Sequence, residues 1–146
     1  MAVHRMDNVG IVVEDLDTVV GFFEEIGLEV EGRMLIDGDW ARAIVGLDDM
    51  RCEIVMMRMP DGHGKLELAH YLAPAAITSE PTPAPPNTLG MRRIMFAVDD
   101  IHDTVERLTA RGGELIGEIG RFEDIFLLCY FRGPEGLIVG LAEELT

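Results

Sequence analysis

The hydrophobic and polar positions of the chain repeat the same order of elements twice. In the first half, an apolar run at 6–13 leads into residues with helical spacing that begin after Asp15 and stop at Gly27. In the second half, the run at 91–98 leads into a similar stretch that begins after Asp100. Aspartate is a common N-terminal cap of helices, and glycine a common C-terminal one. The doubled strand-to-helix unit predicts a duplicated fold with a site between its halves.

Three more strand-like runs follow each predicted helix. The sequence PDGHG at 60–64 separates two of them and is a strong hairpin signal. The expected strands are 28–36, 52–59 and 65–71 in the first half, and 114–119, 125–132 and 137–143 in the second. The pattern between Trp40 and Met50 is weak, and we expect a loop there that lines a cavity. An α+β fold of two tandem βαβββ modules is the prediction.

Prolines mark the connection between the two modules. Five of the seven prolines lie between 73 and 89, a density that excludes a regular helix or a central strand. We therefore expect an extended linker at 73–89 between module one, 5–72, and module two, 90–146. Together they are expected to form a single domain over residues 1–146.

Composition narrows the classes of partner. The 146 residues carry 27 acidic and 12 basic side chains, a net charge of −15 that repels nucleic acid and anionic membranes. A small organic ligand, neutral or cationic, is a more suitable partner. Neither a membrane-spanning apolar run nor a signal peptide is present in the sequence, so we expect a cytoplasmic protein. Cys52 and Cys129 lack CxxC spacing and are expected to be buried, reduced thiols.

Several sequence segments carry a resemblance to a known family. They are VGIVVEDLD, FFEEIGLEVEGR, PDGHGKLELAHY, GMRRIMFAVDDI and RGPEGLIVGLAEEL. With the paired βαβββ pattern, they resemble the vicinal oxygen chelate superfamily, which includes glyoxalase I, extradiol dioxygenases, fosfomycin-resistance proteins and bleomycin-resistance proteins. The resemblance covers nearly the whole chain. It implies a mixed, partly closed barrel-like sheet around a cavity, and a homodimer.

The resemblance also indicates where a metal would be bound. Metal-using members take ligands from the opening and closing strands of each module, positions that correspond here to Asn8, Glu67, Arg93 and Gly140. Only Glu67 is a good ligand for a divalent metal, because arginine offers no lone pair and glycine no side chain. A catalytic metal needs about three protein donors. No cofactor is therefore predicted, and a divalent metal is disfavoured.

The same positions suggest a ligand site without metal. We expect Asn8, Glu67 and Arg93 to bind a small organic ligand, with aromatic surface from Trp40 and Tyr130. Arg93 is expected to take the electrostatic place of the metal by pairing with Glu67. A purely structural ion pair is an equal alternative. The nine methionines also suit a cavity that adapts to a greasy ligand.

Arg92 and the four histidines are further candidates, and each has an alternative interpretation. A register slip of one residue would direct Arg92, in place of its neighbour, into the cavity. His70 lies three positions after Glu67 along the same strand, so its side chain should point to the opposite face of the sheet. The other three histidines are expected in solvent. His4 lies at the terminus, His63 in a hairpin turn and His102 near the start of a helix.

Three classes of function stay open. The first is a binding protein with a degenerate metal site that sequesters a cationic or amphipathic compound. The second is a lyase, isomerase or dioxygenase of glyoxalase type, which would recruit its metal through Glu67 and Asn8. The third is a structural or regulatory partner protein whose cavity is filled by its own side chains. Neither a GxSxG elbow nor a phosphate-binding loop occurs, and no catalytic residue is assigned.

Overall fold

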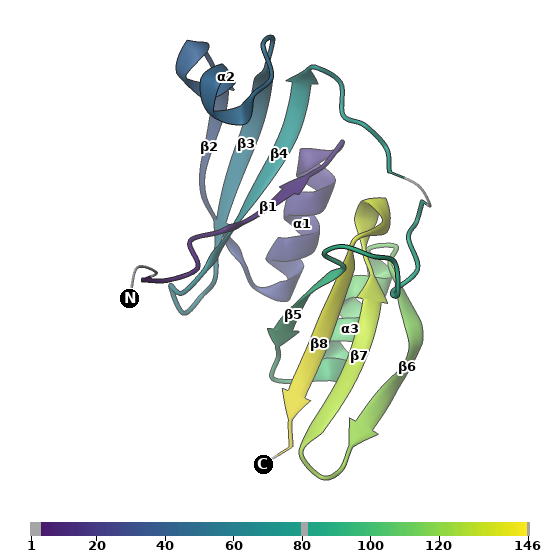
Figure 1. Cartoon of the computed structure of the whole chain (residues 1–146). Helices are drawn as coiled ribbons and strands as arrows, with labels where there is room; N and C mark the ends of the chain where they lie inside the picture. Colours follow the sequence, from purple (N-terminus) through teal and green to yellow (C-terminus); the bar gives the residue numbers. More distant parts are fainter. Residues whose placement is uncertain (1–3, 80–81, 146) are drawn as a thin grey trace. The chain divides into compact units, whose positions relative to one another are not determined.

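Each half of the chain builds a four-stranded mixed sheet with one long helix against it (Figure 1). In this computed structural model, which describes residues 4–79 and 82–145, the chain divides into two units, Met1–Ile77 and Thr78–Thr146. The α+β class and the two tandem modules are thus confirmed. Each sheet is open, with two edge strands, and does not close on itself into a barrel.

Unit 1 contains six elements. They are β1 (Val9–Val12), α1 (Leu16–Ile26), β2 (Glu29–Asp37), α2 (Asp39–Val45), β3 (Arg51–Arg58) and β4 (Lys65–Ala73). The strand order is β1-β4-β3-β2, with β1 parallel to β4 and the other pairs antiparallel. This is the predicted strand, helix and three strands, with one additional helix.

Helix α1 begins and ends where the sequence predicted. The Asp15 carboxylate accepts a hydrogen bond from the Thr18 backbone N–H at 3.1 Å, and Gly27 ends the helix with a φ of 125°. Between these caps, the apolar face of the helix is buried against the sheet. Its buried residues are Leu16, Val19, Val20, Phe22 and Phe23.

Strand register divides the side chains of the first sheet between two faces. Leu66 and Leu68 of β4 are almost completely buried, as are their partners Met57 and Val55 on β3. These side chains form the face against α1. Because successive residues alternate between faces, Glu67 points to the opposite face.

The predicted loop between Trp40 and Met50 is wrong in part, because its first half is α2. The helix lies between Gly38 and Gly46, both with positive φ, and packs through Ala41 against Met50 and Cys52. A helix of seven residues with one buried position gives no apolar period to detect. Its formation depends on the packing of Ala41, which the sequence alone does not indicate.

Unit 2 repeats the order without the additional helix. Its elements are β5 (Arg93–Ala97), α3 (Ile101–Ala110), β6 (Glu114–Phe122), β7 (Phe126–Arg132), a 3₁₀ turn (Pro134–Gly136) and β8 (Ile138–Glu144). The strand order is β5-β8-β7-β6. Asp100 caps α3, as predicted, by accepting a hydrogen bond from the Asp103 backbone N–H at 3.0 Å. The core of this unit lies between α3 and the sheet face that carries Phe96, Phe131 and Leu141.

The segment predicted as a linker, 73–89, begins with the last residue of β4, Ala73, and its other described residues, 74–79 and 82–89, form neither helix nor strand. Glu80 and Pro81 lie outside the described residues. Both cysteines are buried and free, as predicted. In the part of the chain that the structure describes, no helix has the length and apolar character needed to span a membrane.

Candidate functional site

Glu67 is a half-buried carboxylate in the middle of β4. Its register partners are Gly10 of β1 and Met56 of β3, so it lies on the sheet face opposite α1 between a small residue and an adaptable apolar one. Within the described residues, the carboxylate makes no hydrogen bond or ion pair. Because a partly buried charge without a partner is costly, this carboxylate is suited to accept a group from outside the chain.

Two residues that the sequence analysis did not single out for the site share this face. Tyr71 and Cys52 are register partners at the end of the face next to α2, where Met50 and Ala41 cover them. Burial raises the pKa of the Tyr71 hydroxyl, and the negative charges of Cys52 and Glu67 raise it further. Burial likewise raises the pKa of the Cys52 thiol, followed by the effects of Glu67 and Glu53.

The signal for these two residues was present in the alternation of the strands. Tyr71 lies four positions after Glu67, and side chains two or four positions apart share a face. The face therefore combines an apolar wall with a negative field. Such a field favours a cationic group over an anionic one.

Asn8 lies directly before β1 and is exposed. Its side-chain amide donates a hydrogen bond to the Asp7 carboxylate at 3.1 Å. This bond, followed by the one from Arg5, lowers the pKa of Asp7. Asn8 precedes Gly10, the register partner of Glu67, by two residues. Asn8 therefore lies directly before the strand that pairs with the strand of Glu67. Its amide group is hydrogen-bonded to Asp7.

Arg93 opens β5 in unit 2, and its guanidinium lies over the ring of Tyr130. The distance from Arg93 Cζ to the ring centroid is 4.5 Å, within the range of a cation–π interaction. Two predicted site residues are thus in contact, although the sequence analysis did not foresee the stacking. Arg93 is exposed and makes no hydrogen bond or ion pair within the described residues. Its five N–H donors are available to an acceptor.

The space beside Gly140 is taken by a methionine. Gly140 is buried in β8 and is the register partner of both Met95 and Tyr130. A Cβ atom added to Gly140 would lie 2.5 Å from Met95 Cε and 3.4 Å from its Cβ and Cγ. The Met95 side chain therefore lies where a longer side chain at position 140 would start.

The remaining candidates are separate from these clusters. Arg92, the alternative to Arg93, is half-buried, and its buried Nε has no hydrogen-bond partner among the described residues. Trp40 lies on α2 with 62% of its surface exposed. His70 faces the α1 side, as predicted, where its Nδ1 lies 3.2 Å from the Val13 carbonyl oxygen. The ion pair expected between Glu67 and Arg93 remains a prediction.

The donor set does not fit a metal ion. Of the four positions implied by the resemblance, Glu67 offers a carboxylate and Asn8 an amide already bonded to Asp7, whereas Arg93 and Gly140 offer no ligand atom. In residues 4–79 and 82–145, no group of three or more His, Cys, Asp or Glu side chains is arranged to hold a metal ion. We therefore derive no reaction step through a metal.

Comparison with known proteins agrees with this architecture. The family model described as the Glyoxalase/Bleomycin resistance protein/Dioxygenase superfamily matches residues 5–141. A glyoxalase family protein from Bacillus cereus is 50% identical, with a TM-score of 0.96 and coverage of 100% of this chain and 99% of that protein. None of the curated proteins is significantly similar in sequence.

Two more distant structures share the fold. Glyoxalase I from Zea mays is 16% identical with a TM-score of 0.68, and the match covers 97% of this chain and 48% of the maize chain. TnmS3, an antibiotic binding protein from Streptomyces sp. CB03234, is also 16% identical, with a TM-score of 0.62 and coverage of 99% of this chain and 98% of that chain. An enzyme and a binding protein thus share the fold, so the fold alone does not select between them.

Proposed function

Since the chain belongs to the Glyoxalase/Bleomycin resistance protein/Dioxygenase superfamily, we propose that it is a small-molecule-binding member in which its own side chains occupy the metal positions. Its role is to sequester a cationic or amphipathic compound. The observation that carries this proposal is the pair of replacements in unit 2. Arg93 stacks on Tyr130, and Met95 fills the space beside Gly140.

Both replacements oppose a metal at these positions. The guanidinium of Arg93 carries a permanent positive charge that repels a divalent cation. A carboxylate at position 140 would have to displace Met95. An active metal centre would therefore need new residues at positions 93 and 140 and a different packing of Met95.

The nature of the ligand follows from the two surfaces that carry the site residues. Glu67 supplies an acceptor without a partner, and Tyr71 and Met56 supply apolar surface on the same face. The net charge of −15 attracts cations from solution. In unit 2, Arg93 on Tyr130 offers donors to a carbonyl or anionic group of a ligand. TnmS3, an antibiotic binding protein, shares the fold, which supports the compatibility of this fold with the binding of an organic compound.

The test is a thermal-shift screen of cationic aromatic compounds, each with a neutral analogue of the same shape. We expect a subset of the cations to raise the melting temperature and their neutral analogues to have less effect. Glu67→Gln should reduce the shift, whereas Glu144→Gln removes an equal charge from an exposed strand position and should preserve it. A screen without any stabilising cation would oppose the proposal.

A glyoxalase-type lyase, isomerase or dioxygenase is the second candidate function. The free carboxylate of Glu67 at a family ligand position favours it, because a metal could be completed there by water and substrate oxygens. Addition of Ni²⁺, Zn²⁺ or Mn²⁺ to chelator-treated protein separates the two functions. Strong stabilisation by one ion that is lost in Glu67→Ala would favour the enzyme.

We also propose that the chain forms a homodimer, as the family resemblance implies. Sedimentation equilibrium of the purified protein tests this directly. A mass of a single chain at micromolar concentration would contradict it.

A further inference from the structure

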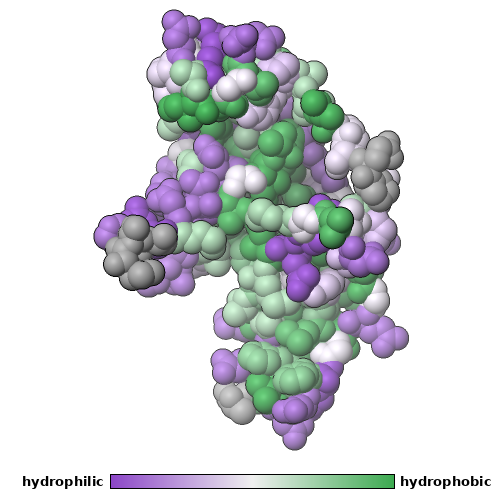
Figure 2. Space-filling model, viewed as in Figure 1, coloured by the Kyte–Doolittle hydropathy of each residue, from purple (hydrophilic) through white to green (hydrophobic). Residues whose placement is uncertain are grey.

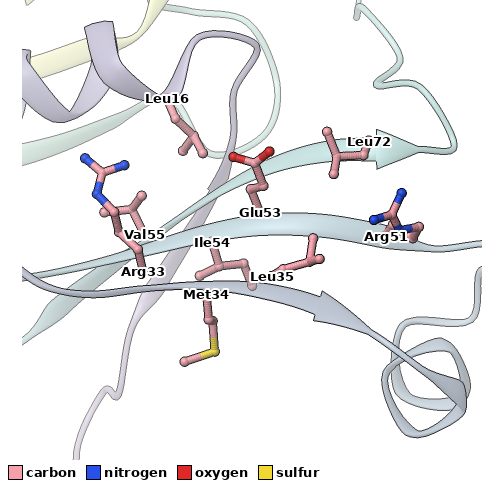
Figure 3. Close-up of a pocket in the computed structure, with 9 residues that line it drawn as sticks. All are labelled: Leu16, Arg33, Met34, Leu35, Arg51, Glu53, Ile54, Val55 and Leu72. Carbon is pink, nitrogen blue, oxygen red and sulfur yellow. The ribbon is translucent and has the colours of Figure 1, made fainter.

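The α1 side of the first sheet contains a depression next to the beginning of the helix (Figure 3). Its volume is about 430 Å³, within the usual range of small-molecule sites. Its lining residues come from α1, β2, β3 and β4, all in unit 1. They are Leu16, Arg33, Met34, Leu35, Arg51, Glu53, Ile54, Val55 and Leu72. This depression lies on the face opposite Glu67 and is separate from the site described above.

Part of the apolar surface of the depression is open to solvent. Leu16 and Val55 are buried, but Leu35 is 50% exposed and Leu72 is 42% exposed. Helix α1 starts at Leu16 and does not cover these two leucines. Two large apolar side chains in one depression form a surface that a greasy group could cover, with a gain of about 25 cal/mol for each Å² removed from water.

Further apolar side chains are exposed around α2 in the same unit. They include Trp40, with 62% of its surface exposed, and Ile44, with 77%. Figure 2 shows apolar surface at the end of unit 1 where α2 lies. In contrast to these scattered side chains, the leucines of the depression lie beside a charged group that could bind a ligand.

That charged group is Glu53, the register partner of Leu35. Figure 3 shows its carboxylate pointing toward Leu16, with Arg33 and Arg51 on either side. Within the described residues, the side chain of Glu53 makes no hydrogen bond or ion pair. It is therefore an acceptor with free capacity above an apolar floor.

The two arginines have other partners. Arg33 Nη1 lies 3.5 Å from Asp17 Oδ1, and Arg51 Nε lies 3.2 Å from Asp37 Oδ2. Asp37 also pairs with Arg42 at 2.6 Å, and Arg42 pairs with Asp39 at 3.5 Å. Asp17 thus offsets Arg33, and the two aspartates together offset Arg42 and Arg51, so Glu53 contributes the uncompensated charge of the depression. The net charge of −15 adds to this negative field. A cation fits this balance better than an anion.

We propose that the depression is a second binding site, for an amphipathic primary amine. The ammonium donates hydrogen bonds to Glu53, and the apolar tail covers Leu35 and Leu72. A small molecule, rather than a protein segment, fits a depression of this volume with its single free acceptor. The site is independent of Glu67 and of the proposed sequestering function.

The experiment is a titration of the full-length, ¹⁵N-labelled protein with hexylammonium, followed by amide chemical shifts at about 150 mM salt. Saturable shifts are expected at 33–35 and 51–55. Ethylammonium, which lacks the tail, and hexanoate, which reverses the charge, should bind more weakly. Glu53→Gln should weaken hexylammonium binding by about fivefold to tenfold.

Two variants serve as controls. Glu144→Gln makes the same change in net charge on an exposed strand position and should leave the affinity unchanged. Glu67→Gln should also leave the shifts at 51–55 unchanged, so a failure of the proposed function and a failure of this site are distinguishable. A leucine variant, Leu72→Ser, should weaken binding of hexylammonium without an effect on ethylammonium.

Three results would overturn the proposal. The first is hexanoate binding as tight as that of hexylammonium, and the second is shifts that do not saturate or that spare 51–55. The third is a fall in the molecular mass of the protein on Leu72→Asp substitution, measured by sedimentation equilibrium. That fall would assign the leucines to an interface between two copies of the chain.

Discussion

Substitution of Gly140 by alanine tests how tightly Met95 fills the space at this position. The added Cβ would lie 2.5 Å from Met95 Cε, so the end of the methionine side chain must move. Met95 is 46% exposed, which gives it a path toward solvent. Overpacking in a rigid core costs about 1–3 kcal/mol. The flexible methionine places the expected cost at the lower end, about 1 kcal/mol.

The assay is urea denaturation followed by circular dichroism, with the free energy of unfolding compared in two backgrounds. Gly140→Ala should destabilise the protein by about 1 kcal/mol when Met95 is present. In Met95→Ala protein, the same substitution should cost little, because the atom that it displaces is absent. The difference between the two costs is the coupling energy of the pair. Equal costs in both backgrounds, or no cost in either, would refute the packing described for Gly140.

Three further predictions follow from individual contacts. Arg93→Gln and Tyr130→Leu, combined in a double-mutant cycle, should give a coupling of about 0.5–1 kcal/mol, and an additive result would contradict the stacking. Gly113→Ala should destabilise the protein by about 3 kcal/mol or more in thermal denaturation, because its Cβ would lie 2.2 Å from the Phe131 ring; near-native stability would refute the contact. Burial raises the pKa of the Cys129 thiol to about 11, so alkylation at neutral pH should be slow. The contribution of this thiol to stability should fall as the pH rises above its unfolded-state pKa of 9.0. Rapid alkylation of native protein would contradict that burial.

Helix boundaries were the part of the fold that local sequence predicted best. Asp15 and Asp100 each cap their helix with a side-chain hydrogen bond, as expected. Caps are local interactions, so residue type and spacing are sufficient to find them. Helix α2 was missed because its one buried residue, Ala41, packs against Met50 and Cys52, which lie outside the helix. No local pattern carries that information.

The candidate site was predictable in its positions but not in its contacts. Glu67 and Arg93 were singled out from the repeat and the resemblance, and strand alternation places Glu67 on the face opposite α1. Neither the stacking of Arg93 on Tyr130 nor the filling of the Gly140 space by Met95 could be predicted, because both depend on side-chain conformations across strands. The depression around Glu53 was missed for a similar reason, since it depends on where α1 begins over the sheet.

Metal analysis of the purified protein tests the central claim most directly. The protein should be purified without chelator, and its bound metal measured by mass spectrometry of the native protein and by elemental analysis. Because Arg93 and Gly140 stand at two of the four ligand positions and offer no ligand atom, we expect far less than one ion per chain and no change in metal content in Glu67→Ala. About one ion per chain, lost in Glu67→Ala, would contradict the account.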